Sequence, residues 1–148
     1  MDIRGALRKS GILIDCEKRS WQEAVHICGE LMHTVGSAEP EYIDAMVDAI
    51  INFGPYIVVA PYIALAHADS KHALKDDLVL AIFREPVIFG SHNDPVHLMF
   101  GLCATESDRH LERLQALAEI LEDEDLCKKL LQCSTENEVY ELIKSKNA

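Results

Sequence analysis

The stretch F-G-P-Y-I-V-V-A-P-Y-I-A-L-A-H-A-D-S, residues 53–70, decides the fold of this chain. Gly54 and the proline after it break the preceding element, and residues 56–59 form a β-branched and aromatic run. Pro61 interrupts this run, and apolar residues resume after it. The pattern predicts two short strands with a kink between them, and it places His67 at the end of the second strand.

His67 stands at the boundary between packed sheet and solvent, because small Ala68 and then polar residues follow it. An imidazole has a pKa close to working pH, so its surroundings decide whether it is neutral. A neutral imidazole in such a place can act as a nucleophile or a proton carrier. A histidine at a strand end that only makes a structural hydrogen bond is the alternative.

The bulk composition indicates one globular domain. The chain has 148 residues, 49% of them hydrophobic and 26% charged, which suits a single domain with a full core. No apolar run approaches the roughly 18 residues of a membrane span. Residues 1–10 lack the apolar core of an export signal. We therefore expect one domain over residues 1–148 and a cytoplasmic location.

Cysteine usage and charge exclude several classes of function. The cysteines are odd in number and none are spaced C-x-x-C, which argues against a disulfide framework and a zinc knuckle. A formal charge of -11 disfavours nucleic acid and anionic lipid but leaves a basic protein partner open. No glycine-rich phosphate loop occurs, which disfavours a nucleotide-dependent kinase. The five cysteines are Cys16, Cys28, Cys103, Cys127 and Cys133.

Two amphipathic helices are predicted before the opening stretch. Ser20 and Glu23 form a capping box, and apolar residues recur at helical spacing over residues 21–35. A second apolar stripe begins at Tyr42 and ends at Gly54. The N-terminal residues before Cys16 predict a short helix and then a brief strand after Gly11.

The second half of the chain predicts strands and then helices. We expect strands at 78–83 and 96–104, with turns at 84–86 and 90–95. A long helix capped by Thr105 and Asp108 should follow the second strand. Two further helices are expected, one at 124–132 and one after the Thr135/Glu138 capping box. Strands and helices do not alternate strictly. The fold class is therefore α/β with a mixed sheet covered by helices, and not a doubly wound parallel sheet.

The other histidines differ in how well the sequence supports a functional role for them. His110 stands in the first turns of a capped helix that follows a strand, where backbone N–H groups and the helix dipole attract anions. If that strand ends on the same sheet edge as the strand of His67, the two imidazoles would meet across a cleft. One would be the nucleophile and the other a donor to a phosphoryl oxygen. We expect ordinary structural or surface roles for His26, His33, His72, His92 and His97.

Two further groups are weaker candidates. Ser70 lies near His67 and Asp69, but there is no G-x-S-x-G elbow, and sequence neighbours on a turn seldom form a triad. Cys103 precedes a helix that could activate its thiol, yet its apolar surroundings favour simple burial.

Four stretches carry a family resemblance: W-Q-E-A-V at 21–25, E-Y-I-D-A-M at 41–46, the segment at 54–68 that contains His67, and S-D-R-H-L-E-R-L-Q-A-L-A at 107–118. The chain resembles the enzyme IIA domains of the bacterial phosphoenolpyruvate-dependent sugar phosphotransferase system, in the mannitol/fructose class. Within that class it is most similar to the ascorbate-type branch. The resemblance implies a central mixed sheet of about five strands flanked by helices.

The resemblance also implies a function. His67 would accept a phosphoryl group from the phosphorylated histidine carrier protein HPr and donate it to a cysteine of a cognate IIB component. His110 would be the second active-site histidine, which stabilises the phosphate. The protein would need no metal or nucleotide and would work with a membrane IIC component in the uptake of an ascorbate-type substrate. Whether it forms a homodimer stays open.

The chain departs from the family pattern at three places. Many relatives have glycine at the position of Tyr62 and proline at that of Ala66, and the mannitol and fructose members carry an arginine after the A-M motif where this chain has M-V-D-A-I-I. The missing arginine favours the ascorbate-type branch. A second reading is a regulatory domain in which phosphorylation of His67 is only a signal. A transition-metal-binding protein is disfavoured, because no ligand spacing supports it.

Overall fold

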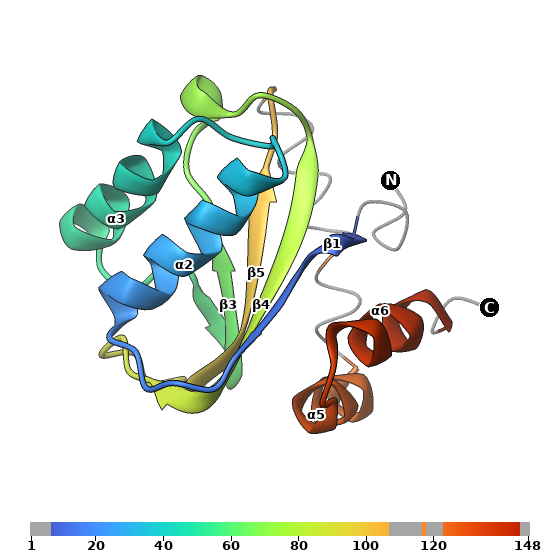
Figure 1. Ribbon diagram of the computed structural model, residues 1–148. Coiled ribbons are helices and arrows are strands. Elements are labelled where there is room, and N and C mark those ends of the chain that lie inside the picture. Colours follow the sequence, from blue (N-terminus) through green and yellow to red (C-terminus); the bar gives the residue numbers. More distant parts are fainter. Residues whose placement is uncertain (1–6, 107–116, 118–122, 146–148) are drawn as a thin grey trace.

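A mixed sheet forms the centre of the molecule in the computed structural model, which describes residues 7–106, 117 and 123–145 (Figure 1). Within these residues the sheet has five strands in the order β1-β4-β5-β3-β2. The strands are β1 (Leu7–Asp15), β2 (Val58–Ala60), β3 (Tyr62–Ala66), β4 (Asp77–Val87) and β5 (Val96–Cys103). The helices are α2 (Trp21–Thr34), α3 (Glu41–Phe53), α5 (Glu124–Gln132) and α6 (Glu136–Ser145), with a short 3-10 helix η1 (Ser70–His72).

The directions of the strands bring three strand ends to one edge of the sheet. β3 runs parallel to β5, with Ala66 opposite Gly101, so both strands end at this edge. β4 is antiparallel to β5 and begins there, with Asp77 opposite Cys103. β1 is parallel to β4 and β2 is antiparallel to β3. The prediction of a mixed sheet is confirmed, and His67 follows directly after the last residue of β3.

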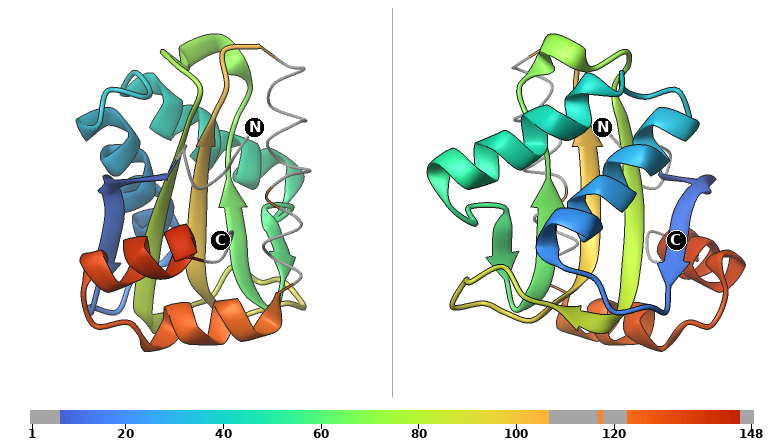
Figure 2. Two further views of the ribbon diagram at one scale, coloured as in Figure 1. Left: turned by 90° about the vertical axis from the view of Figure 1, so that its right-hand side faces the viewer. Right: turned by 60° about the vertical axis from the view of Figure 1, so that its left-hand side comes forward.

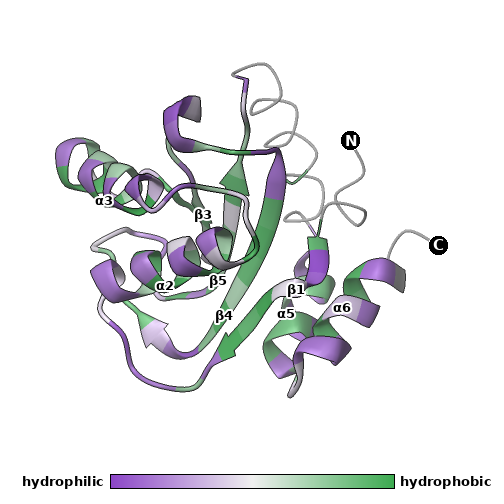
Figure 3. Cartoon of the chain, turned by 45° about the horizontal axis from the view of Figure 1, so that its top comes forward, coloured by the Kyte–Doolittle hydropathy of each residue, from purple (hydrophilic) through white to green (hydrophobic). Residues whose placement is uncertain are grey.

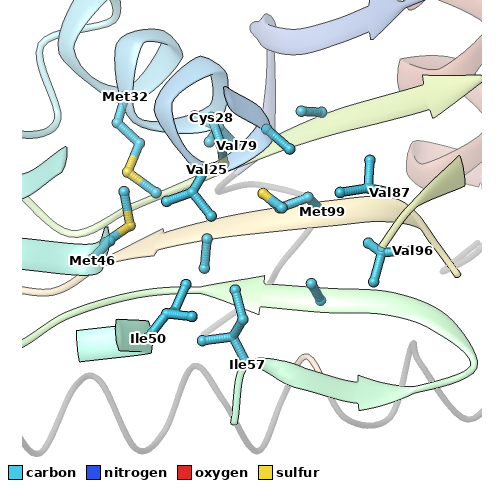
Figure 4. Close-up of a cluster of buried hydrophobic side chains, with 14 of the residues drawn as sticks. Val25, Cys28, Met32, Met46, Ile50, Ile57, Val79, Val87, Val96 and Met99 are labelled. Carbon is cyan, nitrogen blue, oxygen red and sulfur yellow. The ribbon is translucent and has the colours of Figure 1, made fainter. Parts of the chain in front are cut away.

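Helices cover both faces of the sheet (Figures 1 and 2). α2 and α3 pack on one face, and α5 and α6 lie on the other, so that a separate apolar core forms on each side. The first core contains Cys28 and Met32 of α2, Met46 of α3 and Met99 of β5 (Figure 4). Figure 3 shows hydrophilic and hydrophobic residues alternating along these helices, as expected for helices with one buried side. None of the described helices is long and apolar enough to cross a membrane.

The two predicted helices before the opening stretch are confirmed. The Ser20 hydroxyl accepts from the Glu23 N–H at 3.2 Å, and the Glu23 carboxylate accepts from the Ser20 N–H at 2.9 Å, which forms the predicted capping box of α2. At the end of α3, Gly54 has a φ of +85°, a conformation that favours glycine. The two predicted short strands also form, as β2 and β3.

Two predictions of local structure were wrong. The residues before Gly11 form strand and not helix from Leu7 onward, since β1 pairs with β4 and places Leu7 opposite Leu78. The expected turn at 84–86 is instead part of β4. A register shift between Ile82 and Val87 accommodates the proline there, so the strand continues through it.

The C-terminal helices agree with the sequence where the structure describes them. α5 has the predicted bounds, and Thr135 accepts from the Glu138 N–H at 3.2 Å before the first turns of α6. Of the predicted long helix after Thr105, Leu117 is described; it is helical and fully buried in the second core. Asp108 and the other residues of that helix lie outside the described residues.

Gly101 of β5 allows α2 to approach the sheet closely, and we expect Gly101→Ala to destabilise the fold. A Cβ atom at this position would lie 2.3 Å from Met32 Cε and 2.7 Å from both Cys28 Sγ and Val79 Cγ2. Overpacking of this kind costs about 1–3 kcal/mol. Urea unfolding should show that loss, whereas Gly11→Ala, whose nearest neighbour would lie at 3.3 Å, should show a smaller one. Equal effects of the two variants would contradict this reading of the packing.

Candidate functional site

A cleft of about 430 Å³ opens beside the edge of the sheet where β3 ends. One wall comes from α3 and the other from the segment that follows β3. The side chains of Phe53 and Tyr56 stand at the cleft and are both substantially exposed. The described lining contains one histidine, His67, and neither lysine nor arginine; its members are Ala45, Ala49, Phe53, Tyr56, His67, Ala68, Asp69 and Ser70.

The hydrogen bond of His67 fixes which ring nitrogen carries the proton. Nδ1 lies 2.6 Å from the carbonyl oxygen of Leu65. A carbonyl oxygen can only accept, so Nδ1 must donate, and Nε2 of the neutral ring then carries the lone pair. Burial lowers the pKa of His67 below its ordinary value of 6.5, and the Leu65 carbonyl opposes this in part. The geometry therefore supports a neutral imidazole with a nucleophilic Nε2 near pH 7.

Two tyrosines contact the backbone around His67. The Tyr56 ring meets the imidazole edge-on, with centroids 5.4 Å apart and planes at 89°, and its hydroxyl lies 3.3 Å from the His67 carbonyl oxygen. The Tyr42 hydroxyl accepts from the Ala68 N–H at 3.0 Å and donates to the Leu102 carbonyl at 2.8 Å. Burial raises the pKa of both phenols, so both remain protonated hydrogen-bond donors.

The sequence reasoning missed this role of Tyr42. It placed Tyr42 in the apolar stripe of the second helix, which is correct, since the side chain is 1% exposed. A buried tyrosine, however, usually has a partner for its hydroxyl. Its position within an otherwise aliphatic stripe was therefore the available signal.

The condition for a two-histidine site is met, but His110 itself lies outside the described residues. The strands β3 and β5 end at the same edge of the sheet, as that hypothesis requires. Just after β5, Thr105 donates its N–H to Asp76 at 2.8 Å, which anchors the start of the following segment. The pairing of His67 with His110 stays a prediction.

Asp69 and Ser70 line the cleft next to His67. The Asp69 carboxylate accepts from the Lys71 N–H at 3.1 Å and caps η1. This hydrogen bond gives Asp69 a structural role in the turn. Such a role is consistent with the sequence, which has no G-x-S-x-G motif for a catalytic triad.

The structure gives His97, His33 and Cys103 structural roles. His97 donates from Nδ1 to the Phe83 carbonyl at 2.7 Å, which agrees with the structural role expected for it, and His33 makes a similar bond to the Ala38 carbonyl at 3.2 Å. His92 is exposed. Cys103 is 1% exposed, and burial raises its pKa to about 12, so its thiol is not activated.

One group of metal-ligand type occurs among the described residues. Ligand atoms of Glu39, Glu41 and His72 lie within 4.8 Å of one another, although no sequence spacing indicated this. His72 Nδ1 and Glu39 Oε1 are 3.7 Å apart and form an ion pair when the imidazole is protonated. Glu41 stands in the first turn of α3, where a carboxylate interacts favourably with the helix dipole. Each of the three thus has a structural role.

The titration of His67 gives a test of this geometry. We expect the imidazole to titrate with a midpoint below 6.5 in the folded protein, since burial lowers its pKa. The unfolded chain binds this proton at higher pH, so the contribution of His67 to stability is present above pH 6.5 and is lost as pH falls toward the folded pKa. Proton–nitrogen NMR of the ring should show both the low midpoint and the proton on Nδ1. A midpoint at or above 6.5 would contradict the burial.

Comparison with known proteins gives the family. Residues 6–146 match the family described as "Phosphoenolpyruvate-dependent sugar phosphotransferase system, EIIA 2". An ascorbate-specific PTS system EIIA component of Escherichia coli (strain K12) is 33% identical over 152 residues, which cover 100% of this chain and 99% of that protein.

Solved structures agree with this match. The mannitol-specific cryptic phosphotransferase enzyme IIA from Escherichia coli superposes with a TM-score of 0.88 at 31% identity, covering 98% of this chain and 99% of that one. The mannitol enzyme IIA of Escherichia coli, solved in complex with phosphorylated mannitol enzyme IIB, gives 0.82 at 26% identity, with 94% and 99% covered. The chain therefore belongs to the EIIA 2 family of the phosphoenolpyruvate-dependent sugar phosphotransferase system and is a phosphotransferase component.

Proposed function

We propose that this chain is a phosphocarrier in which Nε2 of His67 accepts a phosphoryl group from phosphorylated HPr and donates it to a cysteine of a cognate IIB component. The observation that carries the proposal is the hydrogen bond from His67 Nδ1 to the Leu65 carbonyl, within a cleft. It fixes the neutral tautomer whose Nε2 lone pair can attack phosphorus.

The transfer is an in-line displacement at phosphorus. The Nε2 lone pair of His67 forms the new N–P bond while the bond between phosphorus and the donor's histidine breaks, and that electron pair returns to the donor nitrogen. The ring becomes cationic, and the Leu65 carbonyl stabilises it by accepting from Nδ1–H. In the second step the IIB thiolate attacks the same phosphorus, and the N–P electron pair returns to Nε2. Neither step needs a nucleotide or a metal.

His110 completes the proposed site as a donor to the phosphoryl oxygens. Its expected place near a helix N-terminus, after the strand that ends beside β3, supports this assignment. The described cleft lining has no lysine or arginine and includes Asp69.

Protein partners should dock over the cleft. Phe53 is 79% exposed and Tyr56 is 41% exposed at its rim, and exposed aromatic side chains are typical anchors of interfaces. A mannitol enzyme IIA of the same fold has been solved with phosphorylated IIB, which supports a IIB component as the acceptor here. The charge of -11 favours partners with a basic rim.

An ascorbate-type system is the proposed context. The ascorbate-specific relative aligns with this chain from end to end. The cleft wall from α3 presents Ala45, Ala49 and Phe53 and no arginine, in keeping with the departure from the mannitol and fructose pattern. Ascorbate uptake by a strain that lacks this gene, compared with mannitol uptake, tests the substrate. Loss of mannitol uptake alone would overturn the ascorbate assignment.

Discharge of the phosphorylated protein tests its carrier role. Protein labelled from phosphoenolpyruvate with enzyme I and HPr should lose its label when purified ascorbate-type IIB is added, and the label should appear on IIB. Mannitol IIB serves as the comparison. Label that forms but passes to neither IIB component would favour the regulatory reading, in which phosphorylation is only a signal.

A further inference from the structure

The peptide unit that joins His67 to Ala68 lies just beyond the ladder of the sheet. The last paired residue of β3 is Ala66, opposite Gly101 of β5. The polar groups of the next peptide unit are bonded by side chains instead. The His67 carbonyl lies 3.3 Å from the Tyr56 hydroxyl, and the Ala68 N–H lies 3.0 Å from the Tyr42 hydroxyl.

Tyr42 connects this peptide unit to two other elements. Its ring belongs to the buried face of α3, and its hydroxyl donates to the carbonyl of Leu102 on β5 at 2.8 Å. The same hydroxyl accepts from the Ala68 N–H, so it uses its donor and an acceptor position together. One oxygen atom thereby holds α3, β5 and the segment after β3 at fixed distances.

Tyr56 holds the other side of the same peptide unit. Its hydroxyl donates to the His67 carbonyl, and the edge-on contact of its ring with the imidazole restricts rotation of the His67 side chain. Unlike Tyr42, it is 41% exposed at the cleft. The two phenols therefore act on one peptide plane from different environments.

We propose that Tyr42 and Tyr56 are positioning residues for phosphoryl transfer, which fix the peptide plane after His67 and so keep Nδ1 on the Leu65 carbonyl and Nε2 in one place in the cleft. This inference rests on the proposed function of His67. The orientation of that peptide plane corresponds to the backbone angle ψ of His67. Fixing it therefore fixes the backbone from which the imidazole ring projects. A nucleophile displaced by about 1 Å can lose about a hundredfold in rate.

The difference in exposure separates the effects of the two residues. Tyr42 is buried and does not reach a docked partner, so its hydroxyl affects the chemical step and not the binding of phosphorylated HPr. Tyr56 stands where a partner would dock, so its removal should affect binding as well. A residue that merely stabilised the fold would change neither constant while the protein stayed folded.

Tyr42→Phe is the decisive variant, because it removes the hydroxyl and keeps the ring. We expect the rate of phosphoryl acceptance at saturating phosphorylated HPr to fall about tenfold or more, with KM for HPr within about twofold of wild type. Rapid-quench labelling measures both constants. In the unphosphorylated protein, NMR should show the His67 midpoint moving up toward 6.5 as water reaches the loosened ring.

Tyr140→Phe is the matched control, since Tyr140 lies on α6 at the other face of the sheet. It should leave the rate and the His67 midpoint unchanged. Tyr56→Phe keeps the ring contact and should lower the rate less than Tyr42→Phe. Wild-type rate and midpoint in a folded Tyr42→Phe protein would overturn the proposal.

The NMR readout separates this inference from the proposed function. If the wild-type protein takes no label, the carrier function fails, but the Nδ1 proton and midpoint of His67 still report on the positioning. If Tyr42→Phe is unfolded at the assay temperature, Tyr56→Phe decides: a shifted His67 midpoint supports the positioning, and an unchanged midpoint with an unchanged rate overturns it.

Discussion

Replacement of His67 by alanine is expected to abolish phosphorylation of this protein by phosphoenolpyruvate, enzyme I and HPr. The variant loses the Nε2 lone pair, and the described lining of the cleft contains no second histidine. Wild-type protein should carry a label that acid removes and base does not, as expected for a phosphoramidate. Radioactive labelling followed by gel electrophoresis measures the rate of phosphorylation. This rate should fall by more than about a hundredfold, as expected when a nucleophile is removed.

The matched control for this variant is His97→Gln. His97 has the same kind of hydrogen bond as His67, from Nδ1 to a backbone carbonyl, and is likewise only partly exposed. It lies near the start of β5, however, at the opposite end of the strand from the cleft. Its replacement should leave labelling intact. Labelling of His67→Ala at the wild-type level would sink the assignment of the acceptor.

Local sequence signals predicted the parts of the fold that local chemistry decides. Gly54 and Pro61 interrupt regular structure regardless of distant contacts, so the two short strands β2 and β3 were predictable. The brief strand predicted after Gly11 is part of β1, but the part of β1 before Gly11 was not predicted, because its conformation depends on pairing with β4, about 70 residues later in the chain. Tyr62 has a φ of +73°, a backbone conformation that favours glycine.

The candidate site shows the same difference between local sequence signals and contacts of distant segments. His67 could be found because its apolar approach and polar exit are consecutive in the sequence. The hydroxyl of Tyr42 bonds to residues 26 and 60 positions away, and no spacing within α3 indicates those partners. The contacts of Asp77 with Arg8 and Ser37, which lie 69 and 40 positions away, could likewise not be predicted from the sequence. Sequence spacing therefore did not predict these long-range polar contacts, because each joins segments that are distant in the chain.

Asp77→Ala is expected to cause the largest loss of stability among the polar substitutions considered, about 3 kcal/mol. Asp77 is 5% exposed and begins β4 at the sheet edge where β3 ends. Its carboxylate accepts from the Arg8 guanidinium, from the Ser37 hydroxyl and, at 2.9 Å, from the Leu78 N–H. Arg8 is partly exposed and water can solvate it, whereas the Ser37 side chain is fully buried and would lose its partner.

An exposed ion pair gives the control that separates burial from charge. Asp125 pairs with Lys129 at 3.2 Å on α5, and its side chain is 77% exposed. Both variants remove one aspartate from a pair with a cation, but Asp125→Ala should cost no more than about 0.5 kcal/mol, because water screens the pair and replaces it. Urea unfolding of the two variants measures the difference. A similar small loss in both would mean that Asp77 is solvated in the native protein, and that the sheet edge beside His67 does not depend on its buried carboxylate.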